Sequence, residues 1–90
     1  MVEELMNRYW DMAMESGPDL EGFVKRAAQG DFGPVTPRDI TAFLRQVEEI
    51  TIANIETKAS EGGVFARMKD QVIEETRAQI SELVAKYGEA

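Results

Sequence analysis

The side chains that most often perform chemistry in proteins are missing from this sequence or lack their usual partners. Its 90 residues include no His and no Cys, which removes the commonest general base, the commonest metal ligand and every thiolate nucleophile. The serines are Ser16, Ser60 and Ser81, and a serine nucleophile needs an adjacent base to activate it. Because no such base can be identified, we expect no catalytic residues and predict that the protein is not an enzyme.

Two pairs of neighbouring glutamates are the nearest approach to a metal site. Glu48 and Glu49 would lie at the same height as Glu74 and Glu75 if the segments that contain them form an antiparallel helical hairpin. Di-metal sites in helical bundles combine such glutamates with inward-pointing Glu-x-x-His motifs, and this chain has no His. We therefore place these carboxylates on solvated helix faces, and we expect neither a metal ion nor another cofactor.

The clearest structural signal is the start of a helix after Thr36. Thr36 can accept a hydrogen bond from a backbone N–H of the first turn, and Pro37 suits the first helical position. Asp39 adds negative charge at the positive end of the helix dipole. Apolar residues then recur with helical spacing, so we predict a helix over residues 37–60.

A second long helix follows a glycine turn. Gly62 and Gly63 provide a flexible stop, and apolar residues again recur with helical spacing up to Gly88, which is a natural helix end. The sequence predicts a helix over residues 64–87. Two long helices joined by so short a turn favour an antiparallel hairpin.

The first third of the chain predicts two shorter helices, over residues 2–15 and 18–29, separated by Gly17 and Pro18. We therefore predict an all-α fold in a single domain over residues 1–90. It is a small helical bundle in which two short N-terminal helices pack on a long antiparallel helical hairpin. The predicted core consists of Leu5, Tyr9, Phe23, Val24, Ile40, Phe43, Leu44, Val47, Phe65, Met68, Val72, Ile80 and Leu83.

The N-terminal helix has a wider apolar face than one neighbouring helix can cover. Methionine adapts to irregular surfaces, and Trp and Tyr are enriched at the energetic centres of interfaces. One interpretation is that this helix docks another chain or a second copy of this chain. The other interpretation is an ordinary core helix clamped across the hairpin. The predicted partner-binding residues are Met6, Tyr9, Trp10, Met12 and Met14.

Polar residues interrupt the apolar faces of both long helices. They are Thr51, Asn54, Lys58, Thr76 and Gln79. A buried Asn at a helix seam can specify register or oligomeric state, whereas a less buried half of the hairpin would leave the same residues solvated. For Lys58 and Gln79 we favour solvation. For Asn54 both interpretations stay open, with solvation the favoured one.

The alternative functional hypothesis is a DNA-binding transcriptional regulator. Residues 20–46 could form a helix-turn-helix-like unit that presents Arg38, Thr41 and Arg45 to the bases. The intervening turn is longer than the three or four residues usual in that motif. The chain also has 17 Asp and Glu against 10 Lys and Arg, and a net charge of −7 repels a phosphate backbone.

The favoured hypothesis is therefore a non-enzymatic protein–protein interaction module, such as an oligomeric adaptor, assembly or accessory subunit. A domain this small has a limited core, and without disulfides or metal it is often stabilised by oligomerisation. We expect a homodimer in which two hairpins form a four-helix core. The acidic start of the chain and the lack of a long apolar run favour a cytoplasmic protein with no membrane association.

Overall fold

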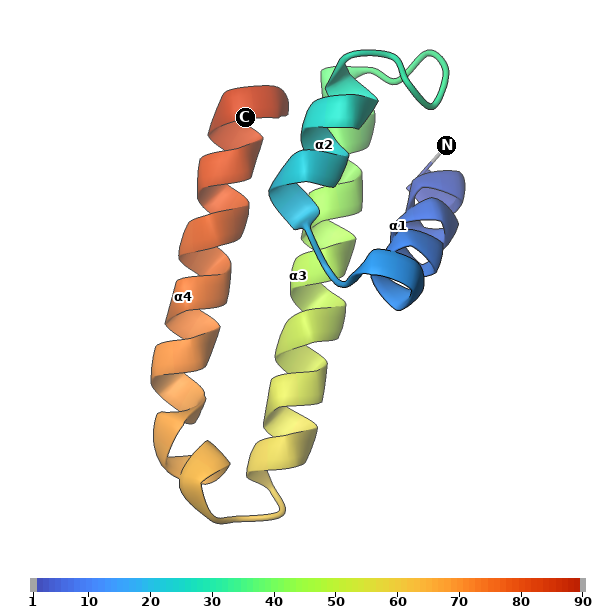
Figure 1. Ribbon diagram of the computed structural model, residues 1–90. Helices are drawn as coiled ribbons and strands as arrows, with labels where there is room; N and C mark the ends of the chain where they lie inside the picture. The colour runs from blue at the N-terminus through green and yellow to red at the C-terminus, as the bar shows by residue number, and fades with distance from the viewer. Residues whose placement is uncertain (1, 90) are drawn as a thin grey trace.

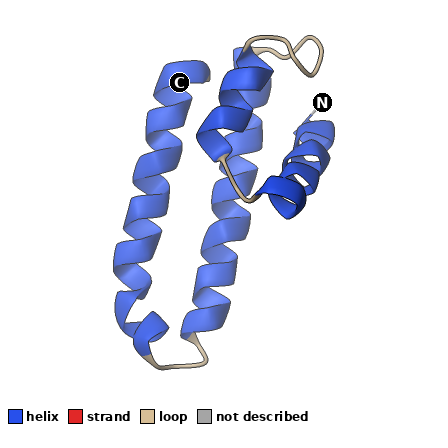
Figure 2. Cartoon of the chain, viewed as in Figure 1, coloured by secondary structure: helices blue, strands red, loops and turns tan. Residues whose placement is uncertain are grey.

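A computed structural model describes residues 2–89 as four helices without any strand (Figure 2). Met1 and Ala90, which the single-domain prediction includes, lie outside the described residues. The helices are α1 (Val2–Ser16), α2 (Leu20–Ala28), α3 (Pro37–Ala59) and α4 (Val64–Tyr87). The predicted all-α fold is confirmed.

Helix α3 begins at the capping signal that the sequence predicts. The Asp39 N–H donates to Thr36 Oγ1, and the Thr36 N–H donates back to Asp39 Oδ2, each over 3.1 Å. These two bonds satisfy backbone donors that the first turn of a helix leaves unpaired. They also hold the pKa of Asp39 below its ordinary value, chiefly through the bond from the Thr36 backbone.

Helix α4 has the predicted bounds, and the helix boundaries that differ from the predictions do so by one or two residues. The largest difference is in α2, which was predicted to begin at residue 18 and begins at Leu20. Asp19 is the N-cap, because its carboxylate accepts the Gly22 N–H over 3.1 Å. The turn between α3 and α4 uses Gly62 and Gly63, whose φ angles of 87° and 81° disfavour residues with a Cβ.

The long helices α3 and α4 lie side by side as an antiparallel hairpin (Figure 1). Helix α2 packs across both of them, and α1 packs against α3. Figure 1 shows both short helices beside the half of the hairpin that contains the C-terminus. The half next to the turn at residues 60–63 has no helix over it, so the molecule has two layers at one end and a single layer at the other.

The core lies in the two-layered half. An aromatic cluster occupies its centre: the Tyr9 ring lies 5.5 Å from Phe23 and 5.8 Å from Phe43 between centroids, and Phe23 lies 5.3 Å from Phe43. Tilted and edge-on geometries of this kind are the favoured ones for aromatic pairs. The buried hydrophobic residues are Leu5, Met6, Tyr9, Leu20, Phe23, Val24, Ala27, Ile40, Phe43, Leu44, Val47, Ile55, Ile80, Leu83 and Val84.

The predicted core was wrong in one region, the first half of α4. Phe65 and Val72 are only half-buried, and Met68 is 45% exposed. These residues have the helical spacing of core positions, but no second layer of residues 2–89 lies over this part of the hairpin. The buried positions that the sequence did not single out, such as Leu20 and Val84, lie where α2 packs on the hairpin.

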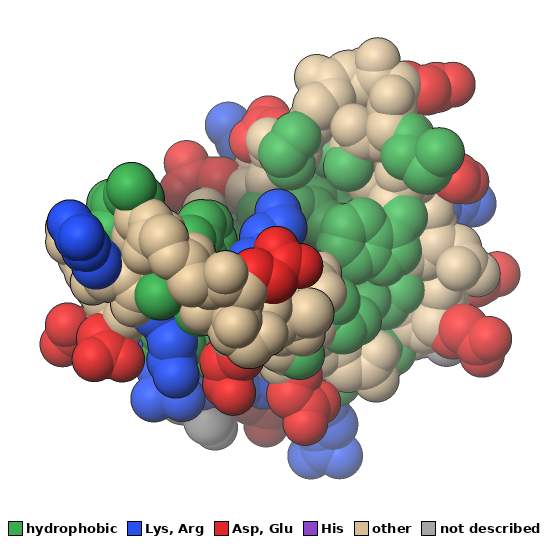
Figure 3. Space-filling view, turned by 90° about the horizontal axis from the view of Figure 1, so that it is seen from below, with side chains coloured by type: hydrophobic (Ala, Val, Ile, Leu, Met, Phe, Trp, Pro, Cys, Tyr) green, Lys and Arg blue, Asp and Glu red, His purple; other side chains and the backbone are tan. Residues whose placement is uncertain are grey.

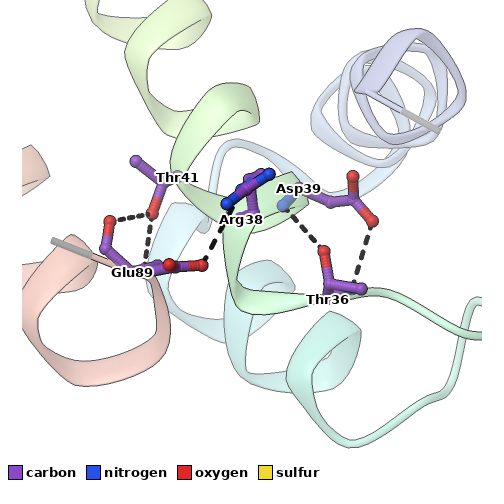
Figure 4. A network of polar contacts seen from close by, with 5 residues as sticks. All are labelled: Thr36, Arg38, Asp39, Thr41 and Glu89. Carbon is purple, nitrogen blue, oxygen red and sulfur yellow. Dashed lines mark hydrogen bonds and ion pairs between the residues drawn. The ribbon is translucent and has the colours of Figure 1, made fainter.

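The C-terminal end of α4 is fastened to the start of α3 (Figure 4). Thr41 Oγ1 donates to the Glu89 carbonyl over 2.9 Å and accepts the Glu89 N–H over 2.7 Å. The Arg38 guanidinium lies 4.0 Å from the Glu89 carboxylate. The Thr41 bonds join residues 48 positions apart and, together with the ion pair, fasten the end of the hairpin opposite its turn.

A second set of polar contacts ties α2 to α4. Lys86 Nζ lies 3.3 Å from the carboxylate of Glu82, four residues earlier on α4, and 3.5 Å from that of Glu21 on α2. The bond to Glu82, followed by the negative charge of Glu21, raises the pKa of Lys86. The pair with Glu21 depends on how α2 packs, so helical spacing alone did not predict it.

The molecule is more extended than a compact protein of its size. Its principal dimensions are 43 × 29 × 18 Å and its radius of gyration is 13.9 Å, against about 12 Å for a compact chain of this length. It exposes 5908 Å², whereas a monomeric protein of this mass exposes about 5,300 Å². Among residues 2–89, no helix is both long enough and apolar enough to cross a membrane.

Candidate docking groove

A groove of about 510 Å³ runs along the uncovered half of the hairpin, below the ends of α1 and α2. One wall is formed by Tyr9 and Trp10 of α1, with Pro18 and Leu20 where the chain enters α2. The floor and the other wall are formed by α3 and α4. The groove therefore lies at the step where the molecule changes from two layers to one.

Tyr9 and Trp10 have different roles although they are neighbours in sequence. Their rings lie 5.2 Å apart, but Tyr9 is buried in the core whereas Trp10 is 39% exposed. Burial, followed by the negative charge of Asp19, raises the pKa of the Tyr9 hydroxyl. Trp10 thus supplies a large, partly solvated aromatic surface at the edge of the groove, and its ring packs against that of Tyr9.

The hairpin contributes an apolar floor with a polar margin. Val47, Ile55 and Ile80 are buried in the floor, and Phe65 is half-buried near the hairpin turn. Among residues 2–89, Lys58 is the one charged side chain that lines the groove, and its Nζ lies 5.9 Å from the centroid of the Phe65 ring. This arrangement suits contact with an apolar surface that also has a few hydrogen-bonding groups.

All five polar residues that interrupt the apolar faces of the long helices line this groove: Thr51, Asn54, Lys58, Thr76 and Gln79. Thr51 and Thr76 are half-buried, and the other three are exposed. Solvation was the favoured interpretation for Lys58, Gln79 and Asn54, and it agrees with their exposure in this chain. The hairpin side of the groove was not predicted as a site, although these residues were its signal in the sequence.

The predicted partner-binding residues do not form one surface. Met6 and Tyr9 are buried in the core, and Trp10 lines the groove. Met12 is half-buried beside a smaller hollow next to Phe32, and Met14 is 85% exposed. The wide apolar face of α1 is thus divided between core packing and a small exposed remainder in which Trp10 is the largest side chain.

The glutamates considered for metal binding lie elsewhere. Of the four, Glu48 and Glu49 line a shallow hollow that also contains Glu56 and Arg77, away from the residues of the groove, and Glu74 and Glu75 line neither. Across residues 2–89, no group of three or more acidic, His or Cys side chains is placed to hold a metal ion. The same residues bury no polar or charged side chain.

The residues of the DNA-binding alternative are engaged within the chain. The Thr41 hydroxyl is bonded to the Glu89 backbone, and Arg38 lies beside the Glu89 carboxylate (Figure 4). Arg45 Nη1 lies 3.5 Å from the Glu48 carboxylate. The end of α4 therefore lies against the beginning of α3, which the hypothesis would place in a DNA groove.

The surface around the groove is apolar at its centre and acidic at its margin. Figure 3 views the molecule from the end of the hairpin turn and shows hydrophobic side chains gathered in one broad patch. Asp and Glu side chains stand along the outer edge of that patch.

No protein-family model, curated protein or solved structure matches this chain, so its functional assignment depends on this geometry.

Proposed function

We propose that the protein is a non-enzymatic protein–protein interaction module of the adaptor, assembly or accessory-subunit type, and that its groove docks a second copy of the same chain. The observation that supports this proposal is the groove itself, where Trp10 and the open half of the α3–α4 hairpin are left without a second layer. A helical hairpin normally buries its apolar face against another helical layer. Two open halves placed face to face would form the four-helix core that a single chain lacks.

The exposed area supports a partner of similar size. The chain exposes roughly 600 Å² more than a compact monomer of its mass. A standard protein–protein interface removes about 800 Å² from each partner. The excess is thus close to what one stable interface would cover, whereas a small-molecule ligand would leave most of it in water.

The chemistry of the groove also suits a second copy. Its polar side chains are hydroxyls and amides, apart from Lys58. Hydroxyl and amide groups both donate and accept hydrogen bonds, so identical residues can pair across a two-fold axis. Each copy has a net charge of −7, and a nearly uncharged groove is the part of the surface where two such copies repel each other least.

The first test is size-exclusion chromatography with light scattering over about 1–200 µM protein. We expect the wild-type chain to be a dimer, and Asn54→Glu to raise its dissociation constant at least about tenfold, since excluding water from a charge costs more than about 1.4 kcal/mol. Asn54 is exposed, and Glu is a good helix former, so this variant should still fold.

Ala53→Glu is the matched control. Ala53 is the preceding residue of α3, is also exposed, and lines the hollow that contains Glu49 and Glu56. The Ala53→Glu substitution should leave the dimer intact. A wild-type chain that is monomeric at every concentration would overturn the proposal, as would equal weakening by both substitutions.

Trp10→Ala tests the other wall of the groove. We expect it to weaken the dimer, because Trp10 is the largest partly exposed side chain at the groove edge. A variant that loses only thermal stability, with its dimerisation unchanged, would show that α1 is an ordinary core helix.

A further inference from the structure

The chain has the shape of a step. Helix α2 stands on one face of the hairpin at the end that contains the C-terminus, and the turn half of the hairpin lacks this layer (Figure 1). The groove lies at the foot of the step, between Trp10 and the open part of α3 and α4. This shape restricts how two copies of the chain can pack against each other.

We propose that two copies pair antiparallel, so that the open half of each hairpin lies against the open half of the other. This inference rests on the dimer proposed above and specifies its arrangement. The hairpin turn of one copy, at residues 60–63, then abuts the α1–α2 connection of the other copy, at residues 17–19. Each step fills the space below the other, and the result is two layers thick throughout.

A parallel arrangement fails on packing distance. Packed helices lie about 8–10 Å apart between axes. If both copies pointed the same way, the two α2 helices would meet first and would hold the hairpins roughly 25–30 Å apart, which is three such spacings. The open halves would then remain in water, whereas antiparallel pairing brings them to a single helix spacing.

The antiparallel arrangement places Asn54 at the centre of the interface. The open part of α3 covers residues 51–59, a length of about 14 Å at 1.5 Å per residue, and Asn54 lies near its middle. A two-fold axis through this middle brings the two Asn54 amides together, where each can donate to and accept from the other. A central Asn of this kind fixes register and oligomeric state in helical interfaces.

Lys58 also gains an acidic neighbourhood in this arrangement. It lies two residues before the hairpin turn, and the α1–α2 connection of the second copy contains Asp19 and closely follows Glu15. Within one chain, Lys58 has no carboxylate within salt-bridge distance among the described ion pairs. The pairing thus places the one positive charge of the groove near two carboxylates.

Single-cysteine cross-linking tests the arrangement, because the native chain has no Cys and each variant has one thiol per copy. The full chain is treated with a short thiol-specific bismaleimide and analysed on denaturing gels. We expect Asn54→Cys to give a cross-linked dimer and Ser60→Cys or Ser16→Cys alone to remain monomeric. A refolded equimolar mixture of the Ser60→Cys and Ser16→Cys chains should give a cross-linked dimer.

Ala53→Cys is the matched control and should not cross-link, because it lies beside Asn54 but outside the groove. Ser60→Cys cross-linking to itself would place the two hairpin turns side by side and overturn the inference. Failure of both Asn54→Cys and the mixed sample, in chains that light scattering shows to be dimeric, would overturn it equally. In both cases the dimer itself would stand, whereas monomeric wild-type protein would remove both proposals.

Discussion

At the scale of single residues, neighbouring side chains of similar character have different functions in this protein. Tyr9 and Trp10 are adjacent aromatics on α1, yet Tyr9 completes the core cluster with Phe23 and Phe43 while Trp10 lines the groove. Successive helical residues point about 100° apart, so only one of them can face the core directly. The same division separates buried Met6 from exposed Met14.

Thr41 provides a residue-scale prediction. Its hydroxyl makes two hydrogen bonds to the Glu89 backbone, and an intramolecular hydrogen bond contributes a net of about 0.5–1.5 kcal/mol. Thr41→Val should lower the free energy of unfolding by about 1–2 kcal/mol and increase amide hydrogen exchange near Tyr87. Urea unfolding followed by circular dichroism gives the first quantity.

Thr57→Val is the control for this prediction. Within the described part of the chain, the Thr57 hydroxyl bonds to the Ala53 carbonyl of its own helix, so the same substitution removes no hydrogen bond between helices there. Equal destabilisation by both variants would show that the link between Thr41 and Glu89 adds nothing beyond helix propensity.

At the scale of elements, the two long helices are uniform in sequence pattern but differ along their length in environment. The N-terminal half of α3 and the C-terminal half of α4 are covered by α1 and α2, and the halves next to the turn are not. Apolar spacing continues through both regions of α3, while Thr51 and Asn54 enter its apolar stripe in the open region. The change of composition along one face therefore marks the boundary of the covered layer.

The capping box of α3 provides an element-scale prediction about pH. Bonds from Thr36 lower the pKa of Asp39 in the folded chain, so the ionised box stabilises the fold fully above the unfolded pKa of about 3.9. That contribution is lost as the pH falls through the lowered folded pKa. Asp39→Asn removes this titration, so the stability advantage of the wild type should shrink as the pH falls below about 4.

Thermal unfolding of both chains at a series of pH values measures this difference directly. The comparison is between the two chains at each pH, since other carboxylates also titrate in this range. If the stability advantage of the wild type stays constant from neutral pH into acid, the ionised carboxylate of Asp39 does not stabilise the capping box as inferred.

At the scale of the whole molecule, net charge and shape act in opposite directions on association. Each copy has a charge of −7, which repels a second copy at long range. The stepped shape and the excess exposed area favour a partner at short range. Burial of apolar area does not depend on ionic screening in the way that repulsion does, so salt separates the two effects.

Dimerisation should therefore strengthen with salt. The Debye length is about 30 Å at 0.01 M salt and about 10 Å at 0.1 M, so repulsion between copies that are 43 Å long is largely screened at the higher concentration. Sedimentation at the two salt concentrations should give a lower dissociation constant at 0.1 M. A constant that rises with salt would mean that ion pairs such as those of Lys58 dominate the interface.

The sequence by itself determined where the helices begin and end and which face of each helix is apolar. Caps at Thr36 and breaks at Gly17 and Gly62 are local, because a hydrogen bond to a nearby N–H or a positive φ involves only a few residues. Helical period likewise determined which face of each helix is apolar, and it identified the largest buried residues of those faces, such as Phe23, Phe43 and Leu83. The polar interruptions at Asn54 and its neighbours were visible at the same level.

Only the tertiary structure decided how far the second layer extends. Phe65, Met68 and Val72 have the spacing of core residues, yet they lie partly exposed because α1 and α2 are too short to reach them. Periodicity specifies a direction around the helix axis and contains no information about what lies in that direction. The groove, the engagement of Thr41 by Glu89 and the step all depend on packing between distant segments, which no local pattern encodes.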